Sequence, residues 1–187
     1  MIPKQINNTE TFYAKNQKEW RKWLEGNHAT KPSVWLVCYK KKTNKPTLSW
    51  TEAVEEALCF GWIDSIKKTI DEDAYIQFFG PRKPKGTWSK INKEKIEKLI
   101  AEGKMMSAGY ESIERAKQNG SWHILTDVEE LIIPEDLLKA FKTKKGSKEH
   151  FLSLSKSVQK YNLMWLTMAK LPATREKRIK VIVDLVD

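Results

Sequence analysis

The sequence has few cysteines and histidines and no long apolar run. Its 187 residues include two Cys and three His, and no CxxC or HExxH motif brings them together, so we expect neither a metal site nor a bound cofactor. Cys38 and Cys59 lie in apolar stretches, which predicts buried free thiols rather than a disulfide. No run approaches the about 20 apolar residues of a membrane-spanning helix. The amino terminus lacks the apolar core of a secretory signal, so we expect a cytoplasmic protein.

Positive charge, by contrast, is in excess. The chain carries 34 Lys and Arg against 24 Asp and Glu, a net charge of +10, and only five of those 34 cations are Arg. Two interpretations remain open. Such a surface either binds an anionic partner (a small molecule, a peptide or nucleic acid) or is a solvated, lysine-rich surface that reflects genome composition. The sequence specifies no oligomeric state.

Hydrophobic patterning in the first half predicts a small sheet with helices. Ser49 and Glu52 have the spacing of a capping box, which opens a helix that Gly61 ends. Residues 62–71 and 74–80 then read as two antiparallel strands of a hairpin. The other expected elements are an extended segment at 11–13, a helix from Asn16 to Gly26, and strands over 33–39 and 47–50.

After residue 90 the pattern changes to helices, the last of which begins near Thr174. The predicted class is therefore α+β: a small, mostly antiparallel sheet with helices, followed by a helical C-terminal half. We divide the chain into an α+β domain over residues 1–122 and a helical region over residues 123–187 packed on it; one continuous domain is the alternative. One longer helix has an apolar stripe formed by Tyr161, Met164, Trp165 and Met168.

Asp64 lies at the end of the most apolar stretch, LCFGWIDS. On a strand that starts at Trp62, alternation places Trp62 and Asp64 on the same face. A carboxylate beside a Trp ring is costly unless it is paired or hydrogen-bonded. The nearest expected partner is Arg82, at the end of the neighbouring strand. The carboxylate is then either part of a structural ion pair or cap, or a group at the mouth of a cleft that orients Arg82 toward a ligand.

The segment GPRKPKGTWSKIN, residues 80–92, predicts a basic loop that leads into a helix. Its prolines and glycines disfavour a helix, and Ser89 is the expected N-cap of the helix that follows. A basic loop at a helix N-terminus can bind an anion, although a surface loop with a buried Trp is the alternative. The P-loop spacing is missing, so nucleotide hydrolysis is not indicated. The predicted ligand-binding residues are Trp62, Asp64, Arg82, Lys83, Trp88, Ser89 and Asn92, with Arg175 and Arg178 as secondary anion contacts.

Three quoted segments resemble one known family. EEALCFGWIDS (55–65), PRKPKGTWSKINKEKIEKLIAEGKM with SAGYESIERAKQNGSW (81–122), and AKLPATREKRIKVIVDLV (169–186) are similar to the YdeI/OmpD-associated family, also called bacteriocin-protection proteins. The three motifs occur in the family's order and span nearly the whole chain. The resemblance implies a bacterial protein linked to tolerance of antimicrobial peptides and to envelope stress, and it implies no established reaction. The matching motif positions are Gly61, Trp62, Asp64, Ser65, Pro81, Arg82, Pro84, Trp88, Ser89, Asn92, Lys170, Thr174, Arg175 and Arg178.

Three functions compete. The leading hypothesis is a non-catalytic protein that binds an anionic ligand in a cleft walled by Trp62 and Trp88, with Arg82 holding the anion. The second is nucleic-acid binding, although no recognised motif is present. The third is an enzyme that uses Asp64 as an acid or base; it ranks last because pairing with Arg82 would oppose protonation near neutral pH. We assign no catalytic residue.

Overall fold

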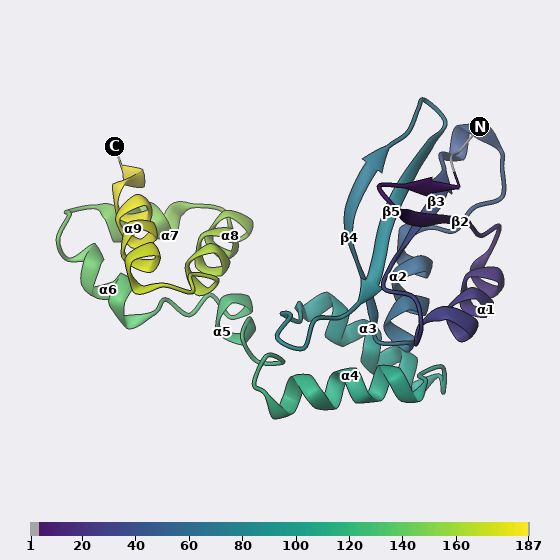
Figure 1. Cartoon of the computed structure of the whole chain (residues 1–187). Coiled ribbons are helices and arrows are strands. Elements are labelled where there is room, and N and C mark those ends of the chain that lie inside the picture. Colours follow the sequence, from purple (N-terminus) through teal and green to yellow (C-terminus); the bar gives the residue numbers. More distant parts are fainter. Residues whose placement is uncertain (1–3, 187) are drawn as a thin grey trace. The chain divides into compact units, whose positions relative to one another are not determined.

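The structure, a computed structural model, describes residues 4–186; residues 1–3 and Asp187, at the ends of the two expected domains, lie outside the described part. The chain forms two compact units (Figure 1). The sheet unit comprises residues up to 86 together with 91–121, and the helical unit comprises residues 87–90 together with those from 122 onward. A sheet in the first half and helices in the second confirm the predicted α+β class.

The sheet unit contains a five-stranded sheet with the order β1-β2-β3-β5-β4. β2 and β3 are parallel, and the other neighbouring pairs are antiparallel, as predicted for most of the sheet. β4 lies at one edge, and its register against β5 shifts between Asp64 and Lys67. The strands are β1 (Gln5–Ile6), β2 (Thr9–Tyr13), β3 (Val34–Tyr39), β4 (Trp62–Thr69) and β5 (Ala74–Pro81).

Local capping signals set the first two helices. The side chain of Asn16 accepts a hydrogen bond from the backbone N–H of Glu19 at 3.0 Å, and Ser49 with Glu52 forms the predicted capping box. Gly61 has a φ of 70° and follows the last turn of α2 as its sequence position predicts. The helices of this part are α1 (Gln17–Asn27), α2 (Trp50–Cys59), α3 (Lys90–Ala101) and α4 (Ser107–Gln118), with a 3-10 turn, η1 (Lys41–Thr43). Only the first residue of α3, Lys90, is counted with the helical unit.

Helices α1 and α2 cover one face of the sheet (Figure 1). The ring of Trp20 packs edge-on against Phe79 with centroids 5.3 Å apart, and Trp23 packs in the same manner on Trp62 at 5.9 Å. Trp20, Trp62 and Phe79 are each at most 1% exposed. Buried aromatic rings of this size dominate the energetics of a small core. They therefore fix the start of β4 and the end of β5 against α1.

The helical unit has its own apolar core. Within residues 4–186, no helix is both long and apolar enough to cross a membrane. The elements are α5 (Thr126–Glu129), α6 (Glu135–Phe141), α7 (Ser147–Ser153), α8 (Lys156–Thr167), α9 (Pro172–Val183) and η2 (Asp184–Val186). The buried core residues are Leu125, Val128, Leu137, Phe141, Phe151, Leu163, Leu166, Ile182 and Val183.

Two sequence predictions about elements are wrong. Residues 47–50 form no strand, because Ser49 caps α2 and Trp50 begins it. The second concerns α8, where only Trp165 of the predicted apolar stripe packs against the core; Tyr161 is 62% exposed and Met168 45%. The inward side instead carries Gln159, Asn162, Leu163 and Leu166.

Candidate functional site

The β4–β5 hairpin places Asp64 and Arg82 at the same end of the sheet. Trp62 pairs with Pro81 and Asp64 with Phe79 in the antiparallel register. The backbone N–H of Arg82 donates to the carbonyl of Gly61 at 2.9 Å, just before β4 begins. Arg82 thus directly follows the neighbouring strand, β5, close to the position that the sequence predicts.

The carboxylate of Asp64 accepts two hydrogen bonds on the helix-covered face of the sheet. Its Oδ2 atom accepts from the indole Nε1 of Trp50, the first residue of α2, at 2.8 Å. The same oxygen accepts from Nε2 of the buried Gln77 on β5 at 3.0 Å. Two neutral donors therefore compensate the half-buried carboxylate for lost water. This arrangement explains how a charge is accommodated next to the apolar stretch.

Arg82 is a cation that is largely withdrawn from water. The residue is 9% exposed. Burial lowers the pKa of its guanidinium to about 10, and the nearby negative charge of Asp64 acts in the opposite direction, raising it. The group remains cationic at neutral pH. The charge of Asp64 thus favours the cationic form of Arg82.

The residues after β5, Arg82–Gly86, form a fixed turn that we call the Arg82 loop. The backbone N–H of Gly86 donates to the carbonyl of Lys83 at 2.9 Å. The carbonyl of Pro84 accepts from Asn119 Nδ2 at 2.7 Å and from Ser121 Oγ at 3.3 Å, both just after α4. Lys83 and Lys85 are exposed. The loop is therefore tied to the end of α4 while its lysines face solvent.

Both Trp rings expected to wall a cleft are buried. Trp62 is 1% exposed and its Nε1 donates to the carbonyl of His28 at 3.1 Å. Trp88 is 3% exposed and packs on Trp122, with ring centroids 5.0 Å apart. Both rings contact the protein's own side chains in this structure, which differs from the expected walls of an open cleft. The alternation of side chains along a strand predicts on which face of the sheet a residue lies, but it does not predict which other elements cover that face.

The remaining predicted ligand-binding residues divide between the units. Asn92 lies half-buried in the first turn of α3, in the sheet unit. Trp88 and Ser89 belong to the helical unit, where Ser89 lines a hollow of about 250 Å³ beside α5 and α8. The group of predicted residues within the sheet unit is therefore Trp62, Asp64, Arg82, Lys83 and Asn92.

Arg175 and Arg178 contact different groups rather than one shared anion. Arg175 pairs with Asp136 through Nε to Oδ2 at 2.5 Å and Nη2 to Oδ1 at 2.9 Å. Arg178 donates from Nη1 to the carbonyl of Trp165 and lies over its ring at 4.9 Å from the centroid. These contacts join α9 to α6 and α8, so both arginines act as packing and pairing groups within the helical unit.

The Arg175–Asp136 pair predicts a pH-dependent contribution to stability. The hydrogen bond from Arg175 lowers the pKa of Asp136 below its usual value. A depressed carboxyl pKa stabilises the fold above the unfolded-state pKa, and this stabilisation is lost as pH falls through the folded-state pKa. Because the Asp136 side chain is 44% exposed, we expect Asp136→Asn to lower the unfolding free energy by only about 0.5–1 kcal/mol at pH 7.

Urea denaturation of wild type and Asp136→Asn at several pH values measures this difference. The difference in unfolding free energy between the two proteins should disappear as the pH falls below the usual Asp pKa of about 3.9. Glu135→Gln is the control, since that side chain is 90% exposed and its Lys139 partner lies 3.9 Å away. A gap that is constant with pH would contradict an electrostatic origin.

Sequence reasoning missed a buried acidic residue on α2. Glu56 is 3% exposed, and its carboxylate accepts from Gln17 Nε2 at 2.7 Å and from Arg21 Nη1 at 2.8 Å, both on α1. Its position in the sequence could have indicated this burial. Glu56 lies three residues after Ala53, on the predicted inward face of the helix. This network joins α1 to α2 and has the character of a structural ion pair.

The cysteines and other potential metal ligands are not gathered into a site. Cys38 and Cys59 are buried and free, as predicted. Burial raises the pKa of each thiol to about 11, so neither is a ready nucleophile at neutral pH. Within the described part of the chain, no three His, Cys, Asp or Glu side chains are placed to hold a metal ion.

Comparison with known families separates the two halves of the chain. A family model described as a domain of unknown function (DUF8412) matches residues 12–112, more than half of the chain, and the protein belongs to that family. A second family model, described as "Bacteriocin-protection, YdeI or OmpD-Associated", matches residues 130–187. Neither the curated proteins nor the solved structures that were compared give a match.

The second match covers less of the chain than the sequence resemblance implied. Of the three quoted motifs, only the last, residues 169–186, lies within the YdeI/OmpD-associated match. The first motif and most of the second fall in the family of unknown function. Similarity to YdeI/OmpD-associated proteins is therefore a property of the C-terminal part, which holds α6 to α9.

Proposed function

We propose that this protein is a non-catalytic binding protein that recognises an anionic ligand at the Arg82 loop. The observation that carries the proposal is the largely buried Arg82 guanidinium, fixed at a strand end beside Asp64. Through its C-terminal similarity to YdeI/OmpD-associated proteins, we further propose that this binding serves tolerance of bacteriocins or antimicrobial peptides and the response to envelope stress.

The charges of the loop support anion binding. A charge that is partly removed from water interacts with an approaching anion in a lower effective dielectric, so the attraction is stronger than at a fully solvated lysine. Lys83 and Lys85 add two solvent-facing cations on the same turn. The hydrogen bonds that hold Pro84 to the end of α4 fix the loop before binding. Less conformational entropy is then lost on complex formation.

The contacts of Asp64 favour binding over catalysis. A general acid or base needs a carboxylate oxygen within reach of the substrate proton. Oδ2 of Asp64 already accepts hydrogen bonds from Trp50 and Gln77, and Arg82 provides a nearby positive charge. Asp64 is thereby suited to orienting the sheet end and the guanidinium, rather than to exchanging protons with a substrate.

Replacing Arg82 with Met tests the site. In a titration of the full chain with inorganic phosphate, followed by ¹H–¹⁵N NMR, wild type should show saturable shift changes at the backbone amides of Arg82, Lys83, Lys85 and Gly86. Arg82→Met should abolish these changes, because the central charge is gone and the apolar stem is kept. Arg82→Lys should retain them in weakened form, since it keeps the charge without the fork of guanidinium donors.

Two controls distinguish the loss of the anion site from misfolding of the variant. Lys45→Met removes an exposed lysine from the β3–α2 connection and should leave the phosphate response unchanged. Amide spectra of Arg82→Met outside the hairpin and loop should match those of wild type. Phosphate-induced changes at residues 82–86 that persist in a folded Arg82→Met protein would refute the proposed anion site.

A further inference from the structure

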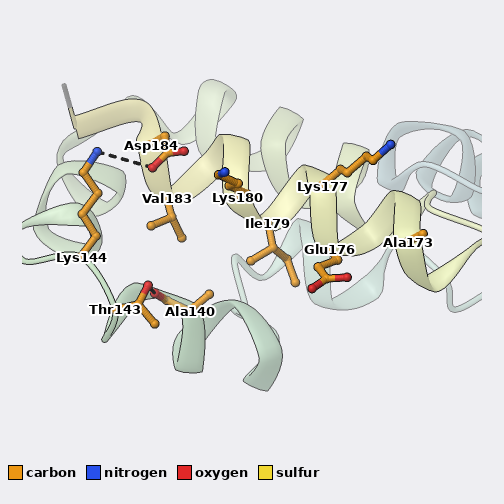
Figure 2. Close-up of a pocket in the computed structure, with 10 residues that line it drawn as sticks. All are labelled: Ala140, Thr143, Lys144, Ala173, Glu176, Lys177, Ile179, Lys180, Val183 and Asp184. Carbon is orange, nitrogen blue, oxygen red and sulfur yellow. Dashed lines mark hydrogen bonds and ion pairs between the residues drawn. The ribbon is translucent and has the colours of Figure 1, made fainter.

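A second hollow lies in the helical unit, away from the residues of the Arg82 loop in sequence. It has a volume of about 660 Å³ and lies between α6 and α9. In Figure 2, Ile179 and Val183 project from α9 toward Ala140 and Thr143 at the end of α6. We call this hollow the α6–α9 groove. Its floor is therefore apolar and is formed by medium-sized and small side chains.

The groove follows one side of α9 from its first turn to its end. The lining residues of α9 recur at intervals of three or four, the spacing of one helical face. Between the first and last of them the axis rises by about 17 Å, which equals roughly three turns of a second helix. Ala140 and Ala173 leave room for the backbone of such a helix to approach closely. The lining residues at or just after α9 are Ala173, Glu176, Lys177, Ile179, Lys180, Val183 and Asp184.

The edges of the groove carry three lysines and two carboxylates. Lys144, Lys177 and Lys180 line it together with Glu176 and Asp184. Asp184 pairs with Lys144 at 3.5 Å, as the dashed line in Figure 2 shows. An adjoining hollow shares Lys144 and adds three more lysines, two from the α6–α7 connection and one from the first turn of α7, against one carboxylate, Glu149. These additional lysines are Lys142, Lys145 and Lys148.

We propose that the α6–α9 groove binds an amphipathic helix of a protein partner, with acidic residues flanking its apolar face. Helix-in-groove recognition requires an apolar channel that is long enough to hold all the anchoring side chains of the helix. The lysine edges select acidic flanks by charge complementarity. The hollow is open to solvent rather than enclosed, so a helix can place one face in it and keep the other in water. A fatty-acid chain in the same place would remain partly exposed to solvent.

A synthetic peptide provides the probe. It has about 14 residues, enough for nearly four helical turns, with Leu on one face and Glu on both sides of that face. Fluorescence anisotropy of the labelled peptide with the 187-residue chain should show saturable binding that weakens as salt rises, because the flanking charges are solvent-exposed. An isomeric peptide with scrambled order, and a peptide with Lys in place of Glu, should bind at least about tenfold more weakly.

Groove variants locate the binding. The double variant Lys177→Glu/Lys180→Glu reverses two exposed edge charges and should weaken the acidic peptide about tenfold. Ala173→Trp leaves the charge unchanged and fills the groove from an exposed position, so it should weaken the peptide as well. Lys156→Glu/Lys170→Glu makes the same charge change at exposed lysines that do not line the groove, and should retain most of the affinity.

The alternatives give distinct results, each of which would overturn the proposal. The scrambled peptide could bind as tightly, or the groove variants could bind the acidic peptide as wild type does. Oleate or vesicles of anionic phospholipid could bind the wild-type protein and bind the groove variants more weakly, while the peptide does not bind. Sedimentation could also show a dimer that Ala173→Trp dissociates, with no binding of the peptide; the groove would then join two copies of the chain.

Discussion

Gly109→Ala is expected to destabilise the sheet unit by about 3 kcal/mol, at the upper end of the usual cost of overpacking a well-packed core. A Cβ atom at Gly109 would lie 2.4 Å from the carbonyl oxygen of Cys59 and 2.6 Å from Cε of Met105. That carbonyl belongs to the last residue of α2 and already accepts from the N–H of Met106 at 3.1 Å. The alanine methyl cannot be accommodated by a side-chain rotation, so the two helices must separate.

Urea denaturation monitored by Trp fluorescence measures the loss. Gly26→Ala is the matched control, because Gly26 lies inside α1 with nothing within 4 Å of its added Cβ. That change should stabilise the protein by roughly 0.5–1 kcal/mol through helix propensity. If Gly109→Ala costs less than about 1 kcal/mol, the close approach of α4 to α2 does not limit stability.

The same helix junction positions the Arg82 loop. A Cβ at Gly61 would lie 2.7 Å from the carbonyl oxygen of Ala108, so α4 also approaches the chain closely just after α2. The carbonyl of Gly61 accepts the backbone N–H of Arg82. Separation of the helices should therefore shift the start of β4, and with it the guanidinium and Asp64. Gly109→Ala should consequently weaken the phosphate response of residues 82–86 even in the fraction that remains folded.

Glu56→Ala should lower the unfolding free energy by about 2–3 kcal/mol. Removing one partner of a buried ion pair typically costs about 3–5 kcal/mol because a buried charge loses its compensation. Here the cost is smaller, since the Arg21 side chain is 26% exposed and keeps contacts with Glu25 at 3.5 Å and the carbonyl of Lys104 at 3.0 Å. Gln17 also loses the acceptor of its side-chain amide.

A double-mutant cycle with Arg21→Ala measures the coupling by chemical denaturation. The double variant should be more stable than the sum of the two single losses predicts, because the uncompensated charge is absent from it. Glu25→Ala is the control: its side chain is 49% exposed, so we expect a loss of no more than about 0.5 kcal/mol. Additive losses at Arg21 and Glu56 would show that the pair makes no net interaction.

Features encoded over a few residues could be predicted from the sequence. The Asn16 cap, the Ser49–Glu52 box, and the turn at Gly61 each depend on neighbouring residues and occur as predicted. The β4–β5 hairpin also has a local signal, and its register brought Arg82 beside the strand of Asp64. The register therefore places the two charged residues of the predicted site at the same end of the sheet.

Features that depend on packing between distant elements could not be predicted. The burial of Trp62 depends on α1, because Trp23 covers its ring. In α8 both sides carry apolar residues, so spacing alone did not identify the inward side. Tertiary packing selected the side with Gln159, whose amide Nε2 donates to the carbonyls of Leu152 and Leu154 at 3.2 and 2.7 Å. A polar residue thus became buried with local partners that periodicity does not reveal.

The position of β4 at the sheet margin affects how the protein behaves in concentrated solution. Extended edges offer backbone groups to strands of other molecules and can seed intermolecular association. Here the register shift between Asp64 and Lys67 breaks the regular ladder, and Lys67 and Lys68 are exposed on the strand. A docking strand would meet an interrupted hydrogen-bonding pattern and two cations. The β4 edge is thereby protected from fibril-like stacking without needing a covering helix.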